Sequence, residues 1–157
     1  MSTTITATPG TPFVDITRDF DAPVAAVFRA HTDPDLYRQW VGPRGLEMDV
    51  LEFEAITGGR WQYVNRSDDG VFGFRGVFHT VRGDELIVQP FEFDGAPDNV
   101  VLSTATFTEH DGRTRLEVHE VYPTAEARDM AVGSGMEYGI VEGYERLDEL
   151  LGADAPV

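Results

Sequence analysis

The stretch TAEARDMAVGSGMEYGIVEGYERLDELL, residues 124–151, decides the fold. In its second half the apolar residues recur at steps of four, four, three and four, which places them on one face of an α-helix. Thr124 is suited to cap the first turn, and Gly152 stands where we expect the helix to end. Such a helix would be about 40 Å long and needs a broad apolar surface to lie on. The apolar face consists of Met136, Ile140, Tyr144, Leu147 and Leu151.

Glycines interrupt this helical pattern near its middle. Gly133 and Gly135 flank a serine, and Gly139 and Gly143 follow. Each glycine costs a helix interior about 1 kcal/mol relative to alanine, so their number calls for a reason. One interpretation is a kink, or a close approach of the helix to the sheet. The other is that the missing side chains leave a void between helix and sheet, which would hold a small apolar ligand. The sequence leaves both open.

The rest of the chain predicts one strand, two short helices and then six strands. Residues 13–20 form the first strand, and the helices begin at Asp21-Ala-Pro23 and Thr32-Asp-Pro34. Turns rich in glycine and aspartate separate the later strands, which indicates hairpins and therefore an antiparallel sheet. We predict an α+β fold whose sheet of about six to seven strands is covered by the long helix. The six later strands are 48–55, one containing Trp61 and Tyr63, 71–81, 86–93, 100–108 and 114–122.

The length of 157 residues suits one domain with one core. Residues 1–12 are small and polar and predict a flexible arm, 13–151 the domain, and 152–157 a short tail. The chain starts without the basic and apolar segments of a secretion signal, and no apolar run approaches the roughly 20 residues that span a bilayer. We therefore expect a cytoplasmic protein without a membrane partner.

The composition excludes several functions. The formal net charge is −16 and the pI about 4.4. Such a surface argues against binding to nucleic acids and anionic membranes, which both attract clustered positive charge. All twelve basic residues are arginine, so a lysine nucleophile or Schiff base is excluded. The absence of cysteine excludes disulfides and thiolate chemistry.

The sequence offers no catalytic or metal-binding motif. It has no nucleophile elbow of the Gly-x-Ser-x-Gly type and no phosphate-binding loop. The histidines lie far apart without the spacing of metal ligands. We predict no catalytic residue, no metal and no cofactor. The four histidines are His31, His79, His110 and His119.

Short motifs in a fixed order carry a family resemblance over residues 13–151. The chain resembles the START-like (SRPBCC) proteins related to the activator of a heat-shock chaperone ATPase. One departure is Val41, where many relatives have a second tryptophan. The motifs are Asp21-Ala-Pro-Val24, Thr32-Asp-Pro-Asp-Leu36, Trp40-Val-Gly-Pro43, Gly58-Gly-Arg-Trp61, Gly76-Val-Phe78, Glu85-Leu-Ile-Val88, Gly112-Arg-Thr-Arg-Leu116, Ala127-Arg-Asp-Met-Ala131, Gly133-Ser-Gly-Met-Glu137 and Arg146-Leu147.

The resemblance implies a helix-grip fold, in which a curved antiparallel sheet wraps around a long C-terminal helix and leaves a cavity between them. The wider superfamily binds lipids, sterols, hormones and polyketides, and includes cyclases and aromatases. The chaperone activator carries a further N-terminal domain for which this chain has no room, so we do not expect chaperone activation to come with the fold. A role in the stress response is what the resemblance implies. Relatives often pair, so the resemblance also implies a homodimer as one assembly.

The candidate ligand-binding residues come from strand and helix phase. Glu120 shares a face with Leu116 and Val118, so it points inward, either as a pocket carboxylate or as a solvated group at the rim. For each aromatic candidate, plain core packing is the alternative. Glu137 is placed to reach either the cavity or the outside. The full set is Trp40, Trp61, Tyr63, Phe74, Phe91, Phe93, Glu120, Gly133, Met136, Glu137 and Ile140.

Three functions remain open. The first is binding of a small hydrophobic molecule in a cavity between the C-terminal helix and the sheet. The second is an enzyme of the cyclase or hydrolase type acting on a hydrophobic substrate there, which requires at least two polar groups converging on the pocket. The third is interaction with a chaperone or with a second copy of the chain, which requires an exposed apolar patch.

Overall fold

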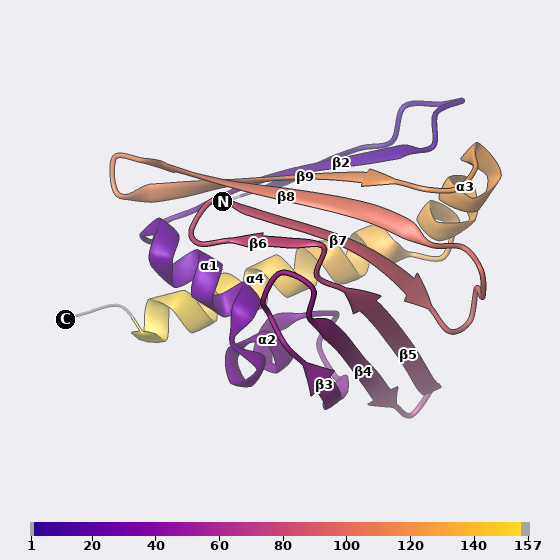
Figure 1. Ribbon diagram of the computed structural model, residues 1–157, viewed down its shortest axis with the longest axis horizontal. Helices are drawn as coiled ribbons and strands as arrows, with labels where there is room; N and C mark the ends of the chain where they lie inside the picture. Colours follow the sequence, from indigo (N-terminus) through magenta and orange to yellow (C-terminus); the bar gives the residue numbers. More distant parts are fainter. Residues whose placement is uncertain (1, 155–157) are drawn as a thin grey trace.

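The structure, a computed structural model, describes residues 2–154, and these fold into one curved sheet with helices on its concave side (Figure 1). The elements, in chain order, are β1 (Thr3–Thr6), β2 (Phe13–Phe20), α1 (Val24–Thr32), α2 (Pro34–Trp40), β3 (Glu47–Phe53), β4 (Arg60–Ser67), β5 (Gly70–Val77), β6 (Thr80–Arg82), β7 (Leu86–Phe93), β8 (Val101–His110), β9 (Arg113–Val121), α3 (Ala125–Gly133) and α4 (Met136–Asp154).

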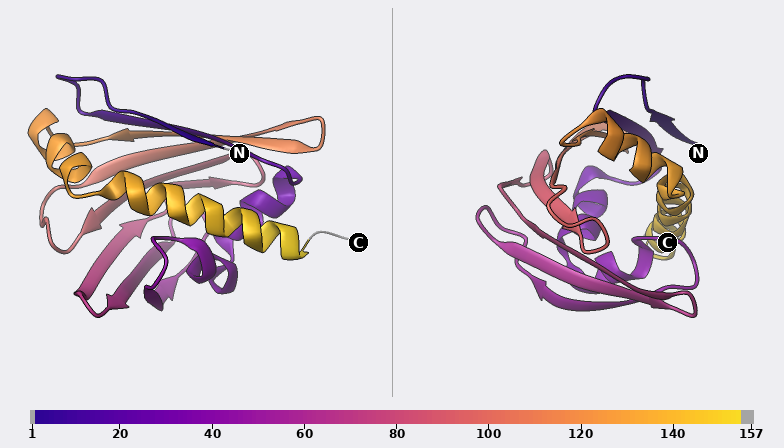
Figure 2. Two further views of the ribbon diagram at one scale, coloured as in Figure 1. Left: turned by 180° about the vertical axis from the view of Figure 1, so that it is seen from behind. Right: turned by 90° about the vertical axis from the view of Figure 1, so that its right-hand side faces the viewer.

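All strand pairs are antiparallel, and the sheet does not close into a barrel. The strand order is β1-β2-β9-β8-β7-β5-β4-β3, with β6 pairing to β7. Helix α4 lies across the concave side, and the strands curve around it (Figure 2). Helices α1 and α2 lie on the same side and contact α4. The predicted α+β helix-grip fold is confirmed.

The predicted count of six to seven strands is wrong, because the described residues form nine. One additional strand is β1, which lies inside the stretch predicted as a flexible arm and pairs with β2. Its sequence, TTIT, is too short and polar to show an alternating pattern. The other is β6, which the sequence joins to β5. The backbone changes partner between them, since the Phe78 N–H donates to Gly59 O (2.8 Å) and the His79 N–H to Val88 O (2.8 Å).

The single long helix predicted for residues 124–151 is also wrong, because it is divided into α3 and α4. Gly135 has a φ of 90°, a left-handed conformation that ends a helix and favours glycine. The glycine-rich stretch is therefore a break between two helices rather than a kink within one. The predicted cap is present, since Thr124 Oγ1 accepts a hydrogen bond from the Ala127 N–H (3.0 Å). Helix α4 has 19 residues and is about 28 Å long rather than 40 Å.

The two later glycines allow α4 to approach the loop after α2, and not the sheet. A Cβ atom on Gly143 would lie 3.1 Å from the Trp40 carbonyl oxygen, and one on Gly139 would lie 3.4 Å from Pro43 Cδ. Arg146 reinforces this contact by donating to the carbonyl oxygens of Gln39 (2.6 Å) and Gly42 (3.2 Å). The loop is thereby fixed along α4.

We expect Gly143→Ala to lower the free energy of unfolding by about 1 kcal/mol, because the gain in helix propensity is outweighed by a backbone atom that must move. Gly133→Ala is the matched control. A Cβ atom there meets nothing within 4 Å, so this change is expected to stabilise the protein by up to about 1 kcal/mol. Urea unfolding measures both. Equal stabilisation by the two alanines would show that the loop does not press on α4.

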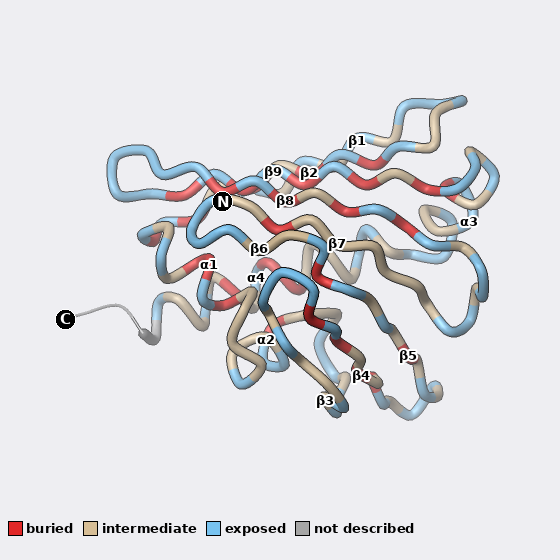
Figure 3. The backbone as a smooth tube through the Cα atoms, viewed as in Figure 1, coloured by how far each residue is buried: buried red, intermediate tan, exposed pale blue. Residues whose placement is uncertain are grey.

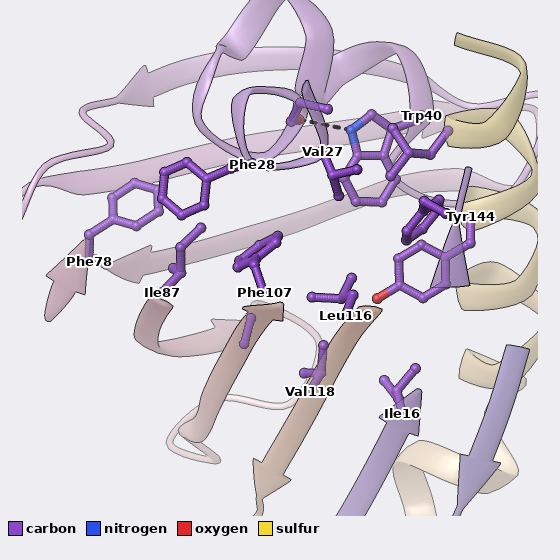
Figure 4. Close-up of a cluster of buried hydrophobic side chains, with 14 of the residues drawn as sticks. Ile16, Val27, Phe28, Trp40, Phe78, Ile87, Phe107, Leu116, Val118 and Tyr144 are labelled. Carbon is purple, nitrogen blue, oxygen red and sulfur yellow. Dashed lines mark hydrogen bonds between the residues drawn. The ribbon is translucent and has the colours of Figure 1, made fainter. Parts of the chain in front are cut away.

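The core fills the space between the sheet and the helices. Buried positions alternate along β2, β4, β8 and β9, as expected for strands with one face inward (Figure 3). Under α4 the space is packed by Phe20, Leu116, Tyr144 and Leu147. Figure 4 shows the hydroxyl end of Tyr144 pointing toward Leu116. Within the described residues, no helix is both long and apolar enough to cross a membrane.

Candidate functional site

Five of the predicted aromatic residues lie together on the concave face of β4, β5 and β7. Cross-strand pairing brings Tyr63 opposite Phe74 and Phe74 opposite Phe93. Their rings are in contact, with centroids 5.3 Å apart for Tyr63–Phe74 and 5.0 Å for Phe74–Phe93. Trp61 stacks on Tyr63 at 5.4 Å and approaches Phe91 at 6.5 Å. We call these five residues the aromatic wall.

The aromatic wall runs from the interior of the protein to solvent. Trp61 and Tyr63 are 4% and 6% exposed, whereas Phe74, Phe91 and Phe93 are half-buried. The inner end depends on a glycine. A Cβ atom on Gly76 would lie 2.7 Å from the indole ring of Trp61, so only glycine at this position lets the ring lie flat against β5.

A small, largely enclosed cavity lies at the inner end of the wall. Its volume of about 30 Å³ is enough for about two water molecules. It is formed between α1 and α2 on one side and the sheet on the other, and no residue of α4 lines it. The cavity is therefore displaced from the position expected between the C-terminal helix and the sheet. Figure 4 shows Phe78 and Ile87 of its lining next to Phe28. The lining residues are His31, Tyr37, Phe53, Trp61, Phe78, Ile87, Gln89 and Ala105.

Two polar side chains of the cavity lining have no hydrogen-bond partner among the described residues. The first is Trp61, whose Nε1–H is completely buried. The second is Gln89, whose amide makes no hydrogen bond to residues 2–154. By contrast, the other tryptophan, Trp40, donates its Nε1–H to Ala30 O at 2.9 Å. A buried donor without an acceptor costs stability, so the Trp61 N–H calls for a functional reason.

The two titratable side chains that line the cavity, His31 and Tyr37, are neutral at pH 7. Burial lowers the pKa of His31 to about 4. Its Nδ1 lies 2.8 Å from Val27 O, and because a carbonyl only accepts, Nδ1 carries the proton and Nε2 is left as an acceptor. Burial raises the pKa of Tyr37 to about 12. The cavity lining contains no arginine, aspartate or glutamate.

A polar row crosses the concave face and ends at the cavity. Glu120 on β9 is opposite Ser103 on β8, and Ser103 is opposite Gln89 on β7. Glu120 is only 8% exposed, so it is not a solvated rim residue. Burial raises its pKa to about 7, and the Tyr122 hydroxyl donates to its Oε1 at 3.3 Å. We call Glu120, Ser103 and Gln89 the polar row.

The remaining predicted residues lie elsewhere. Trp40 is buried behind the cavity and stacks on Tyr144 with centroids 5.8 Å apart. Met136 and Ile140 are partly buried on α4. Gly133 and Glu137 are exposed at the junction of α3 and α4 and do not line the cavity.

Of the eight lining residues, only Trp61 was among the predicted site residues, and four of the other seven illustrate the signals that the sequence offered. Gln89 and Ala105 share the strand phase of predicted neighbours, since Gln89 alternates with Ile87 and Phe91. His31 follows Val27 by one helical turn and therefore lies on its buried face. Tyr37 is on the apolar face of α2, three residues before Trp40. Polar and small residues within an apolar phase are the signal that would have identified the cavity.

A second hollow, of about 360 Å³, is open to solvent beside α2 and the start of β3. Its lining is mixed in charge, which is unlike the apolar pockets that hold small molecules. No group of three histidine, cysteine, aspartate or glutamate side chains within residues 2–154 is placed to hold a metal ion. The hollow is lined by Arg38, Gln39, Leu46, Glu47, Met48 and Asp49.

The sequence of residues 21–152 matches the family described as activator of Hsp90 ATPase homolog 1-like protein. The chain belongs to this family. The match confirms the resemblance drawn from the motifs.

Solved structures share the whole fold. A protein from Rhodobacter sphaeroides is 28% identical, with a TM-score of 0.86 over 96% of this chain and 99% of that chain. A protein from Mycobacterium smegmatis is 26% identical, with a TM-score of 0.86 over 99% and 100% of the two chains. An Arthrobacter aurescens protein, 22% identical with a TM-score of 0.87 over 96% and 91%, shares the fold. No curated protein matches the chain.

Proposed function

We propose that this protein binds a small, mostly apolar molecule on the concave side of its sheet, along the aromatic wall. The observation that carries the proposal is the continuity of the wall with the cavity, because Trp61 belongs to both. The outer rings, Phe74, Phe91 and Phe93, are half-buried although they point to the concave side. The family supports the same conclusion, since the START-like fold commonly holds hydrophobic ligands.

Binding requires the wall to move. A cavity of about 150 Å³ accepts benzene, whereas the cavity here is about 30 Å³. The half-buried rings are the part of the wall with access to solvent, so their displacement opens the path to Trp61 at least cost. We therefore propose a ligand that enters from the Phe91 and Phe93 end and enlarges the cavity as it binds.

The alternative of an enzyme is less well supported. An acid–base site needs two polar groups on one pocket, one with a perturbed pKa. His31 and Tyr37 line the cavity, but their pKa values, about 4 and about 12, keep both groups neutral at pH 7. Glu120, whose pKa is about 7, does not line the cavity, because Ser103 and Gln89 separate it from that space. This separation favours binding over catalysis.

The proposal predicts that filling the cavity abolishes binding. Ala105 lines the cavity, and Ala105→Val adds two methyl groups facing it. We expect the dissociation constant for N-phenyl-1-naphthylamine, an apolar fluorescent probe, to rise about tenfold or more, with stability unchanged or increased. The matched control is Thr104→Val on the outer face of the same strand, which should leave binding unchanged. Equal binding by both variants would place the probe outside the cavity, and an absence of binding to the unmodified protein would contradict the proposed function.

A further inference from the structure

Glu120 is a buried acid with one carboxyl oxygen left over. Its side chain faces the concave side of the sheet, because it follows the buried residues Leu116 and Val118 in the alternation of β9. The Tyr122 hydroxyl donates to Oε1, whereas Oε2 accepts no hydrogen bond from residues 2–154. Oε2 keeps some surface that a water-sized group can touch. The partner of Glu120 on β2 is the apolar Val14, so this side of the carboxyl offers no polar contact.

Both buried arginines of the described chain have other partners. Arg18 pairs with Asp148, and Arg128 pairs with Asp129. The chain contains no lysine. Burial is therefore the main influence on the Glu120 carboxyl, and it raises the pKa of this group to about 7. A buried carboxyl without a cation costs stability, so its presence calls for a reason.

Two further oxygen-bearing side chains stand in line with Glu120 on the concave face. Ser103 on β8 is its cross-strand partner and is 5% exposed, and Gln89 on β7 is in turn the partner of Ser103. Neither side chain is hydrogen-bonded within the part of the chain that the structure describes, and neither is fully sealed from solvent. Neighbouring strands are about 4.8 Å apart, so the polar row spans about 10 Å.

The other groups around Glu120 supply no cation to it. Tyr144 on α4 is close enough to interact with the carboxyl, since burial and then Glu120 raise the pKa of the Tyr144 hydroxyl, which stays neutral. His119 lies on the outer face of β9, where it pairs with Asp15 (2.6 Å). The site is thus an acid beside neutral oxygen atoms, which suits an ammonium group with its three N–H donors.

The charge of the whole protein and the neighbouring ring favour the same kind of ligand. The formal net charge of −16 attracts cations and repels anions. Phe91, a half-buried ring of the aromatic wall, stands next to Gln89 on the same face of β7. An apolar body that rests on Phe91 therefore places an attached polar group over the polar row.

We propose that the ligand is a primary amine with a flat apolar body. Its ammonium group pairs with Glu120 Oε2 and donates to the hydroxyl oxygen of Ser103, while its body lies along the aromatic wall from Phe91. Pairing requires the ionised carboxylate, so a protonated Glu120 gives its proton to solvent when the amine binds. This inference rests on the proposed function and names the class of ligand that the site takes.

Three probes with one apolar body test the inference: 2-naphthylmethylamine, 2-naphthylmethanol and 2-naphthoate, titrated calorimetrically at pH 8 in about 0.15 M salt, which screens surface charges. We expect the amine to bind about tenfold or more tightly than the alcohol, and the alcohol more tightly than 2-naphthoate. In Glu120→Gln, the preference for the amine over the alcohol should fall to about twofold, while the affinity for the alcohol stays within about threefold. The matched control is Glu117→Gln on the exposed face of the same strand, which should keep the preference.

Proton release gives a second measurement that a merely structural role of Glu120 would not produce. At pH 6.5, binding of the amine should release about 0.5 proton or more, because pairing lowers the pKa of Glu120. The number of protons is obtained from the change in binding enthalpy between buffers of different ionisation enthalpy. The release should disappear in Glu120→Gln and persist in Glu117→Gln.

Each other outcome contradicts the inference in a distinct way. Equal affinity for the amine and the alcohol would leave the proposed function intact and overturn the recognition of an ammonium group. Tightest binding of 2-naphthoate would overturn the preference for cations. An undiminished preference or proton release in Glu120→Gln would show that another carboxylate binds the amine. Failure of all three probes to bind would overturn this inference and the proposed function together.

Discussion

Asp148→Ala is expected to lower the free energy of unfolding by about 3 kcal/mol, because it leaves a buried arginine without its carboxylate. Arg18 on β2 is 1% exposed and hydrogen-bonds to Asp148 on α4. Its remaining bonds go to Asp19 O (2.6 Å) and Thr3 Oγ1 (3.2 Å). These contacts join α4 to the far end of the sheet. The side chain of Asp148 is 36% exposed, so water can reach the site. We therefore expect a loss of stability at the lower end of the range for breaking a buried ion pair.

The neighbouring residue provides a matched control. Glu149 pairs with Arg44, and both side chains are well exposed, at 62% and 47%. Glu149→Ala is therefore expected to change the urea midpoint far less than Asp148→Ala, although both remove one carboxylate from the same turn of α4. The double variant Arg18→Met with Asp148→Ala should regain much of the loss, since no unpaired charge stays buried. A midpoint shift for Asp148→Ala as small as that for Glu149→Ala would contradict this account.

The fold could be predicted from sequence wherever a local pattern determines the structure. The cap at Thr124 and the alternation of Leu116, Val118 and Glu120 were read directly from residue types and spacing. The pairing of β1 with β2 and the division of β5 from β6 could not be predicted in this way, because both depend on which other strand each segment pairs with. The break at Gly135 could be predicted only in part. The glycines indicated a kink, but only the backbone conformation shows that the helix ends.

The site was predictable in part for the same reason. Strand phase identified the aromatic wall, because inward-facing residues follow a period of two. The position of the cavity was missed, since it depends on how α1 and α2 pack against the sheet. The family resemblance implied a cavity between the C-terminal helix and the sheet, but Tyr144 and Leu147 fill space beneath α4. Glu120 was identified by phase, but its burial could be seen only once α4 was in place.

Glu120→Gln is expected to change how stability depends on pH, because burial raises the pKa of this carboxyl from about 4.5 to about 7. Between these two values the folded protein keeps a proton that the unfolded chain releases. Stability therefore falls as pH rises from about 4.5 to about 7 and is constant above that range. The loss is on the order of 3 kcal/mol, at 1.36 kcal/mol per pKa unit. Glutamine has no proton to release and removes this slope.

His31 has the opposite effect on how stability depends on pH. The quantity to compare is therefore the difference in free energy of unfolding between Glu120→Gln and the unmodified protein at each pH. The pKa of His31 is lowered from 6.5 to about 4, so between these values the unfolded chain binds a proton that the folded protein does not, and stability rises with pH. The two slopes overlap between pH 4.5 and 6.5 and partly cancel in the unmodified protein.

Urea unfolding of the unmodified protein and Glu120→Gln from pH 4.5 to 8 separates the two groups. We expect the stability advantage of Glu120→Gln to grow through this window and to level off above pH 7, since only the Glu120 contribution differs. Glu117→Gln on the exposed face of the same strand controls for the loss of one negative charge and should give a curve parallel to that of the unmodified protein. If Glu120→Gln also gave a parallel curve, Glu120 would be hydrated in the folded state. The polar row would then be open to water at its Glu120 end.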